Sequence, residues 1–219
     1  MSSSPTQVTE EIYQYLRKNF SSEDEFLRQL KLDAKEAGIP EICISEEQGK
    51  FLQFFLKSIN AKYVLEIGSL AGYSAITMAR ALPEGGKLIA VEINEKNARF
   101  IEQMAEKAGL ADKIEVVFAD AKEFLASWKP EFELDFVFVD ADKKGYKTYF
   151  ELTTPHIRKG GVFAADNALG FGHIAEPNPK SEPGNVKAIQ EMNQILKNSP
   201  LYNSCLVTVG DGMAMGIKL

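Results

Sequence analysis

The chain has 219 residues, of which 45% are hydrophobic and 26% charged, and its formal net charge is -6 at pH 7. These values are typical of one soluble α/β domain and argue against nucleic acid or an anionic membrane surface as the main partner. The sequence has no 18-residue apolar run and no signal-peptide pattern, and Cys43 and Cys205 form no C-x-x-C motif, so we expect a cytoplasmic protein without a zinc site or disulfide framework.

The first sixty residues are predicted to be helical. The patterns indicate helices over 6–20, over 21–38 and from Ser45 to Ile59, with Ser22 and Ser45 as N-caps of the second and third. Each cap is followed three residues later by Glu or Gln, the spacing of a capping box. An apolar stripe runs along the first helix: Ile12, Tyr15, Leu16 and Phe20.

From residue 62 onward, strand and helix patterns alternate. Strands are predicted at 63–67, 87–92, 114–118, 134–140 and 161–166, and helices at about 73–82, 95–108, 120–128, 145–158 and 185–198. The strands are continuous apolar runs, which favours a parallel sheet covered on both faces. The last residues, 202–219, read as two strands joined at Gly210–Gly212, a hairpin signal. We therefore predict an α/β fold with a Rossmann-like, doubly wound sheet of seven strands ending in an antiparallel hairpin.

The loop after the first strand, in YVLEIGSLAGYS, carries the most informative spacing. Glu66, Gly68 and Gly72 give E-x-G-x-x-x-G, and Leu70 stands where a dinucleotide fingerprint needs its second glycine. A carboxylate beside the first glycine repels phosphate and suits a cation. S-adenosylmethionine (SAM) has an ammonium and a sulfonium and no phosphate, so the loop fits SAM better than NAD. A glycine turn without a ligand remains an alternative.

Carboxylates follow the ends of the next strands. Glu92 can accept both ribose hydroxyls of an adenosine, whether in SAM or NAD, and Asp120 can contact an adenine edge or simply cap the next helix. Asp140 closes the fourth strand and Asp166–Asn167 closes the fifth, so parallel neighbours would place them in one cleft. Two carboxylates and an amide carbonyl suit Mg²⁺, Mn²⁺ or Ca²⁺, although these groups could instead cap loops and hold backbone amides.

One long irregular stretch, 168–184, leaves the fifth strand and contains three prolines. Ligands of open α/β sheets bind beyond the carboxyl ends of the strands, so this segment is expected to overhang the site. Together with residues 39–44 it is predicted to close over the acceptor. Glu176 and Glu182 beside Lys180 make a poor footprint for the phosphates of coenzyme A, which favours a small acceptor.

In combination, SINAKYVLEIGSLAGYSA, AVEIN, EKAGLADKIE, FVFVDADKKGY, GGVFAADN and VGDGM resemble the cation-dependent O-methyltransferases that act on catechols and caffeoyl-CoA. The resemblance spans roughly residues 42–219, and the terminal hairpin is also typical of SAM-dependent methyltransferases. It implies a divalent cation at Asp140, Asp166 and Asn167, and catalytic roles for Asp140 and for Lys143, the proposed base. It also implies SAM contacts by the following residues: Ile44, Glu66, Gly68, Ser69, Ser74, Glu92, Asp120, Ala121 and Asp140.

The resemblance thus implies metal-dependent methyl transfer from SAM to a hydroxyl of a catechol-like or caffeoyl-type acceptor. Two features depart from the family pattern: Gly170 replaces an expected aromatic residue, so the aromatic wall is either missing or supplied by Phe171, and no third carboxylate for the acceptor is evident. We expect a single domain over 1–219, with residues 1–60 as a cap or dimerisation region, and a homodimer without nucleic-acid or membrane partners. An NAD(P)-linked oxidoreductase and a non-catalytic SAM-binding protein are the alternatives.

Overall fold

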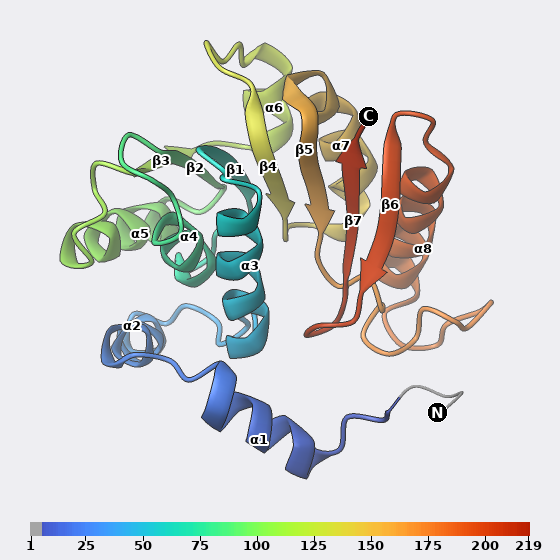
Figure 1. Ribbon diagram of the computed structural model, residues 1–219, viewed down its shortest axis with the longest axis horizontal. Helices are drawn as coiled ribbons and strands as arrows, with labels where there is room; N and C mark the ends of the chain where they lie inside the picture. Colours follow the sequence, from blue (N-terminus) through green and yellow to red (C-terminus); the bar gives the residue numbers. More distant parts are fainter. Residues whose placement is uncertain (1–5) are drawn as a thin grey trace.

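The computed structural model describes residues 6–219, and its centre is a seven-stranded sheet of order β3-β2-β1-β4-β5-β7-β6 (Figure 1). The strands are β1 Tyr63–Ile67, β2 Lys87–Glu92, β3 Ile114–Phe118, β4 Leu134–Val139, β5 Ile157–Ala165, β6 Tyr202–Val207 and β7 Met213–Lys218. Strands β1 to β5 pair in parallel, and β7 is antiparallel to both β5 and β6. The predicted doubly wound sheet with its terminal hairpin is confirmed.

Helices cover both faces of this sheet. They are α1 Glu10–Phe20, α2 Glu25–Glu36, α3 Glu46–Ser58, α4 Tyr73–Ala79, α5 Glu95–Lys107, α6 Ala121–Ser127, α7 Tyr146–Thr153 and α8 Pro183–Asn198, with 3₁₀ turns η1 Lys143–Gly145 and η2 Thr154–His156. Side chains alternate along a strand, so Val64 packs with residues of α2 to α5 while its neighbour Leu65 packs with residues of α6 to α8. Two hydrophobic layers therefore hold the sheet between them.

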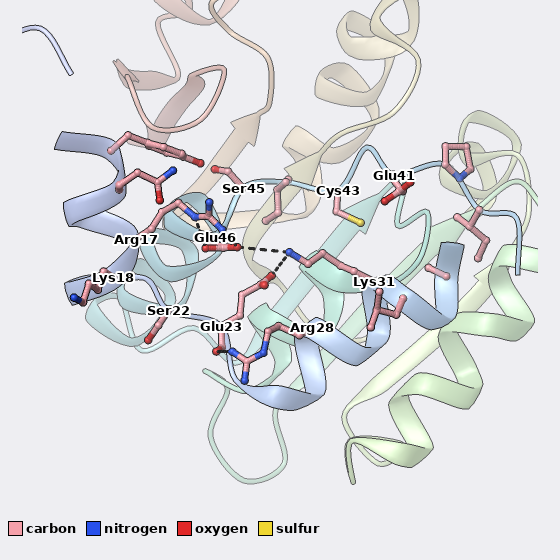
Figure 2. Close-up of a pocket in the computed structure, with 17 residues that line it drawn as sticks. Arg17, Lys18, Ser22, Glu23, Arg28, Lys31, Glu41, Cys43, Ser45 and Glu46 are labelled. Carbon is pink, nitrogen blue, oxygen red and sulfur yellow. Dashed lines mark hydrogen bonds and ion pairs between the residues drawn. The ribbon is translucent and has the colours of Figure 1, made fainter. Parts of the chain in front are cut away.

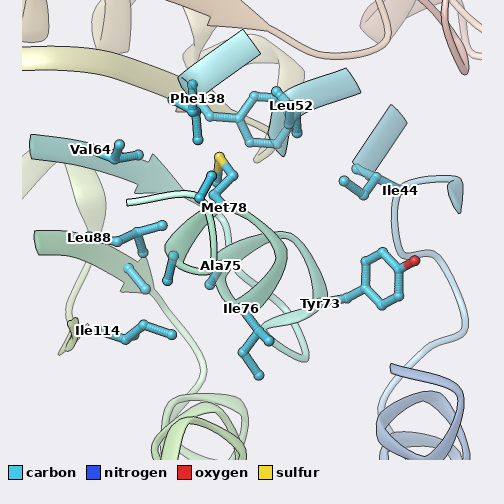
Figure 3. Packing of buried hydrophobic residues seen from close by; sticks show 14 of the residues in the cluster. Ile44, Leu52, Val64, Tyr73, Ala75, Ile76, Met78, Leu88, Ile114 and Phe138 are labelled. Carbon is cyan, nitrogen blue, oxygen red and sulfur yellow. The ribbon is translucent and has the colours of Figure 1, made fainter. Parts of the chain in front are cut away.

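Helix α4 follows β1, and the loop between them carries the spaced glycines of the sequence analysis. All seven of its residues are buried, and Figure 3 shows Met78 pointing toward Leu52 of α3 and Phe138 of β4. Burial on this scale fixes the start of α4 rigidly against the sheet, because the lost contacts of a displaced core side chain cost several kcal/mol. The loop between β1 and α4 is thus anchored at both ends.

The N-terminal helix α1 lies apart from the sheet, on the side toward which β4 and β5 point (Figure 1). None of its residues is buried, and Tyr15 and Phe20 of the apolar stripe are 59% and 62% exposed. Its firmest tie to the rest of the chain is the pair of hydrogen bonds from Arg17 to Glu46 of α3. Within residues 6–219 no helix has the length and apolar character needed to span a membrane.

Two local predictions were wrong. The N-cap of α2 is Asp24 and not Ser22, since the Asp24 carboxylate accepts the Leu27 N–H at 2.9 Å. Strand β5 begins at Ile157, within the helix predicted over 145–158, because Pro155 ends the helical run in a 3₁₀ turn. Gly161, expected to be the first residue of the strand, lies with Gly160 inside β5 at an irregularity in its pairing with β4.

Candidate functional site

A cavity of about 960 Å³ opens at the carboxyl ends of the parallel strands. It gathers residues from the loop after β1, the ends of β2, β4 and β5, the start of α3 and the turn between β6 and β7. Nearly all predicted site residues line it: Ile44, Gly68, Ser69, Ser74, Glu92, Asp120, Ala121, Asp140, Lys143, Asp166 and Asn167. Glu66 is the exception, since it is fully buried behind the wall.

The loop after β1 depends on glycine. Gly68 has φ +87°, and a Cβ there would collide with the main-chain carbonyl of Asp140 at the end of β4. Gly72, at φ +77°, is the N-cap of α4 and has no side chain to cap the helix. Leu70 also adopts a left-handed conformation, with φ +49°, which is unusual for a residue with a side chain. The loop is therefore held in a shape that brings bare backbone to the cavity.

Glu66 is a buried carboxylate next to this loop. Ser69 Oγ donates to its Oε2 at 2.5 Å, while Oε1 is buried without a hydrogen-bond partner in the described part of the chain. Burial raises the pKa of Glu66 to about 7, although hydrogen bonds from Ser69 and Ser74 oppose this shift. An unpartnered carboxylate oxygen is costly to bury, and a cationic ligand would relieve that cost.

Glu92 and Asp120 both bind backbone amides. Glu92 accepts the N–H of Leu70 at 2.8 Å through one oxygen and that of Asn94 at 2.8 Å through the other. It thereby ties the end of β2 to the strained loop, and each oxygen keeps a lone pair for a further donor. Asp120 is the N-cap of α6, where its Oδ1 accepts from Lys122 and Glu123. The capping alternative for Asp120 is thus present, at a position that also faces the cavity.

The parallel pairing of β4 and β5 brings Asp140 and Asp166 together. Val139 pairs with Ala165, so the two carboxylates follow at the same edge of the sheet. Asp166 is 4% exposed, and burial, followed by the nearby charge of Asp140, raises its pKa above the usual range for a carboxyl. Lys143 Nζ donates to Asp140 Oδ1 at 2.9 Å and to the hydroxyl of buried Tyr146 at 2.8 Å.

The donor set at this edge is two carboxylates and one amide. Asn167 follows Asp166 with φ +57°, and its Nδ2 donates to Asp211 Oδ2 at 3.2 Å. No cluster of three or more His, Cys, Asp or Glu side chains within residues 6–219 is placed to hold a metal ion. Any cation here would therefore depend on the mixed set Asp140, Asp166 and Asn167, whose oxygen atoms are the ligands that Mg²⁺ and Mn²⁺ prefer.

Three residues of the site were not identified from the sequence. Gln48, expected to complete a capping box with Ser45, instead donates from Nε2 to Asp166 Oδ1 at 2.5 Å, although Ser45 does cap α3. Asp211 lies in the hairpin turn and accepts from Asn167 and from the Phe171 N–H. The hydroxyl of the buried Tyr146 accepts a hydrogen bond from Lys143 Nζ. The VGDGM motif around Asp211 and the FVFVDADKKGY motif that ends on Tyr146 were the available signals, and nothing local marked Gln48.

A second cavity, of about 880 Å³, lies between α1, α2 and residues 39–46, and it shares Cys43, Ile44 and Ser45 with the first (Figure 2). Figure 2 shows Glu46 between Arg17 and Lys31, with Lys31 also reaching Glu23 at 2.7 Å. These charges neutralise one another within the chain. The second cavity therefore has paired ions in place of the open carboxylates of the first.

Comparison with known proteins agrees with this geometry. The family model described as O-methyltransferase matches residues 17–219. A catechol O-methyltransferase of Niastella koreensis is 35% identical over 96% of this chain and 98% of its own length, and caffeoyl-CoA O-methyltransferase 1 of Arabidopsis thaliana is 32% identical over 94% and 84%. The crystal structure of an O-methyltransferase from Bacillus cereus in complex with SAH superposes with a TM-score of 0.88 at 30% identity, covering 95% of this chain and 97% of that one. The chain belongs to the O-methyltransferase family.

Proposed function

We propose that this O-methyltransferase transfers the methyl group of SAM to one hydroxyl of a vicinal diol on an aromatic ring, using a divalent cation held by Asp140, Asp166 and Asn167. One observation carries the proposal: a single cavity joins the glycine loop after β1 to the carboxylates that end β4 and β5. The similarity to a protein named catechol O-methyltransferase, and to a structure containing SAH, supports the same reaction.

The loop after β1 offers what the methionine part of SAM requires. Glu66 Oε1 is buried and unpartnered, so it suits the ammonium group, and Gly68 lets the loop lie directly against the main chain of Asp140. Ser69 and Ser74 supply hydroxyls beside it. Glu92 has lone pairs left for the ribose hydroxyls. These five positions account for binding without any group that would favour a pyrophosphate.

The carboxylate pair fits a divalent cation. Asp140 and Asp166 lie side by side, with Lys143 paired to Asp140, and burial, followed by the charge of Asp140, raises the pKa of Asp166. Oxygen ligands in this number leave coordination positions open for a diol. When bound, a divalent cation would lower the pKa of the acceptor hydroxyl, near 10 for a phenol, and fix its orientation.

Lys143 is the residue that we propose receives the proton of the acceptor hydroxyl. Its side chain is 11% exposed and is fixed by Asp140 Oδ1 and by Tyr146 OH, so Nζ has little freedom to leave the cavity. To accept that proton, the Lys143 ammonium must first release its own proton to solvent, and the freed amine can then take the hydroxyl proton as the methyl group moves to the oxygen. The remaining acceleration would come from orientation, because a methyl group and a fixed oxygen held in line need little further ordering.

The acceptor side of the cavity favours a small diol. Phe171, at φ +58° and 41% exposed, is the one aromatic ring that residues 168–184 bring to the cavity. The same segment carries Glu176, whose Oε1 contacts His173 Nδ1 at 2.7 Å, and Glu182, which precedes α8, against Lys180 alone, so its charge is net negative. A phosphate-rich acceptor would be repelled on this side. We therefore propose a free catechol in preference to a coenzyme A ester.

A panel of catechols, caffeate and caffeoyl-CoA with isotopically labelled SAM would test this assignment. We expect this panel to give labelled catechol products. In a second experiment, Lys143→Met is expected to lower kcat about 10²-fold while its affinity for SAH stays unchanged. Lys147→Met is the control, since the Lys147 side chain on α7 is 53% exposed and forms an ion pair with Glu191 at 3.7 Å. Turnover of caffeoyl-CoA equal to or above that of caffeate would overturn the acceptor class. SAH binding without any methyl transfer would favour the non-catalytic alternative, and NAD binding without SAH binding an oxidoreductase.

A further inference from the structure

The start of α3 reaches the candidate metal ligands through one buried side chain. Gln48 is 2% exposed, and its Nε2 donates to Asp166 Oδ1 at 2.5 Å, across 118 positions of sequence. A carboxylate oxygen accepts hydrogen bonds when ionised, so the amide nitrogen of Gln48 is the atom that must face it. Burying the amide of Gln48 without a hydrogen-bond partner would cost free energy, so this contact favours one orientation of the Gln48 side chain.

The hairpin turn between β6 and β7 closes the other side of Gln48. Gly210 has φ +60°, and a Cβ at this position would collide with Gln48 Oε1. The next residue, Asp211, accepts the Nδ2 hydrogen of Asn167 at 3.2 Å. Because that bond occupies the amide nitrogen of Asn167, its carbonyl oxygen is left as the atom available to a cation.

We infer that Gln48 is a positioning residue for the metal site, holding the Asp166 carboxylate in a fixed orientation while Asp211 fixes the adjacent amide of Asn167. The inference rests on the proposed function, since it assumes that Asp166 and Asn167 are ligands. A side chain that hydrogen-bonds to a metal ligand fixes the orientation of that ligand, and its removal typically weakens metal affinity 10-fold to 100-fold. In this arrangement Gln48 acts on the cation through Asp166.

The consequence concerns the role of the N-terminal region. Helix α3 begins at Glu46, whose carboxylate also binds Arg17 of α1, two residues before the side chain that holds Asp166. The placement of α3 is thus linked to the geometry of the carboxylate pair. A substitution at Gln48 is expected to weaken cation binding without changing the SAM loop, because that loop is fixed by β1, α4 and Glu92.

The test measures Mn²⁺ binding directly, by the electron paramagnetic resonance signal of free Mn²⁺ during a titration, in the absence of any acceptor. Gln48→Met keeps the volume and removes the donor, and we expect its Mn²⁺ dissociation constant to rise at least tenfold while the SAH dissociation constant changes less than twofold. Gln48→Asn, which keeps an amide but shortens it by one methylene, should show the same direction of change. It also serves as the second variant if Gln48→Met does not fold.

Gln53→Met is the matched control. Gln53 is on the same helix and donates to the Thr77 carbonyl at 3.1 Å, away from the carboxylates, so its loss should leave Mn²⁺ affinity unaltered. Unchanged Mn²⁺ affinity in both Gln48 variants would overturn the inference while leaving the metal proposal intact. An equal loss in Gln53→Met would also overturn it, since the effect would then come from the helix as a whole. A parent protein that binds no Mn²⁺ would refute the proposed metal chemistry and this inference with it.

Discussion

Glu66→Gln gives the sharpest prediction about the SAM loop, because it keeps the shape of the side chain and removes its charge. Burial raises the pKa of Glu66 from 4.5 to about 7 in the folded protein. Between pH 4.5 and 7 the Glu66 carboxyl is ionised in the unfolded chain but still protonated in the folded protein. The free energy of unfolding therefore falls as the pH rises through this range, and above pH 7 the total loss is roughly 3 kcal/mol. We expect Glu66→Gln to be more stable than the parent at pH 8 by up to about that amount, with a difference that shrinks toward pH 5.

The same ionisation should govern cofactor affinity, since the ammonium group of the ligand favours the carboxylate. With a pKa of about 7, roughly one tenth of Glu66 is ionised at pH 6 and roughly nine tenths at pH 8. The affinity for SAH should therefore rise nearly tenfold over this range. Glu66→Gln should bind SAH about 10-fold to 100-fold more weakly at pH 8, the cost of losing a charged hydrogen bond, and its affinity should not change with pH.

Isothermal titration calorimetry at pH 6, 7 and 8, with a chelator present, measures both quantities. Repeating the titration in two buffers of different ionisation enthalpy should reveal a proton released on binding at pH 6 and almost none at pH 8. Asp166 also has a raised pKa, so Asp166→Asn is the control and should keep the pH dependence of the parent. An SAH affinity of the parent protein that is equal at pH 6 and 8 would refute the reasoning. So would an SAH affinity of Glu66→Gln that changes with pH as much as that of the parent.

Three further predictions follow from other parts of the chain. Gly68→Ala should abolish SAH binding in calorimetry, because its Cβ collides with the Asp140 carbonyl; retained binding would contradict the loop geometry. Asp135→Ala should lower the free energy of unfolding in urea by about 3–5 kcal/mol, since this buried carboxylate binds the Lys62 and Tyr63 amides and Arg158; a loss below about 1 kcal/mol would refute that role. We propose a homodimer through the exposed face of α1, so light scattering should give twice the chain mass of 24.3 kDa, and Phe20→Glu should give monomers; a monomeric parent contradicts this.

The sheet and the location of the site were predictable because their signals are local. Continuous apolar strands, each ending in a carboxylate or glycine, specify parallel pairing, and parallel pairing alone brings Asp140 and Asp166 to one edge. The hairpin was recognisable from Gly210 to Gly212 for the same reason. Boundaries were less certain where two residues compete for one role, as Ser22 and Asp24 did for the cap of α2.

What the sequence could not provide were contacts that depend on the assembled fold. The bond from Gln48 to Asp166 joins positions 118 residues apart, and the spacing after Ser45 favoured a local capping role instead. The full burial of Glu66 and its raised pKa follow from packing on both sides of β1, which no local pattern reports. The two hydrogen bonds that Glu92 accepts, from the N–H groups of Leu70 and Asn94, likewise depend on the conformation of the strained loop.

The central claim is that a divalent cation held by Asp140, Asp166 and Asn167 is needed for methyl transfer to a catechol. The most direct measurement is transfer of labelled methyl from SAM to catechol by protein depleted of metal with a chelator, before and after Mg²⁺ or Mn²⁺ is added, with Asp166→Ala assayed alongside. We expect no turnover in the depleted protein, recovery with either cation, and no recovery in Asp166→Ala despite intact SAH binding. Full-rate methylation by the depleted protein would contradict the claim and leave these residues with a structural role.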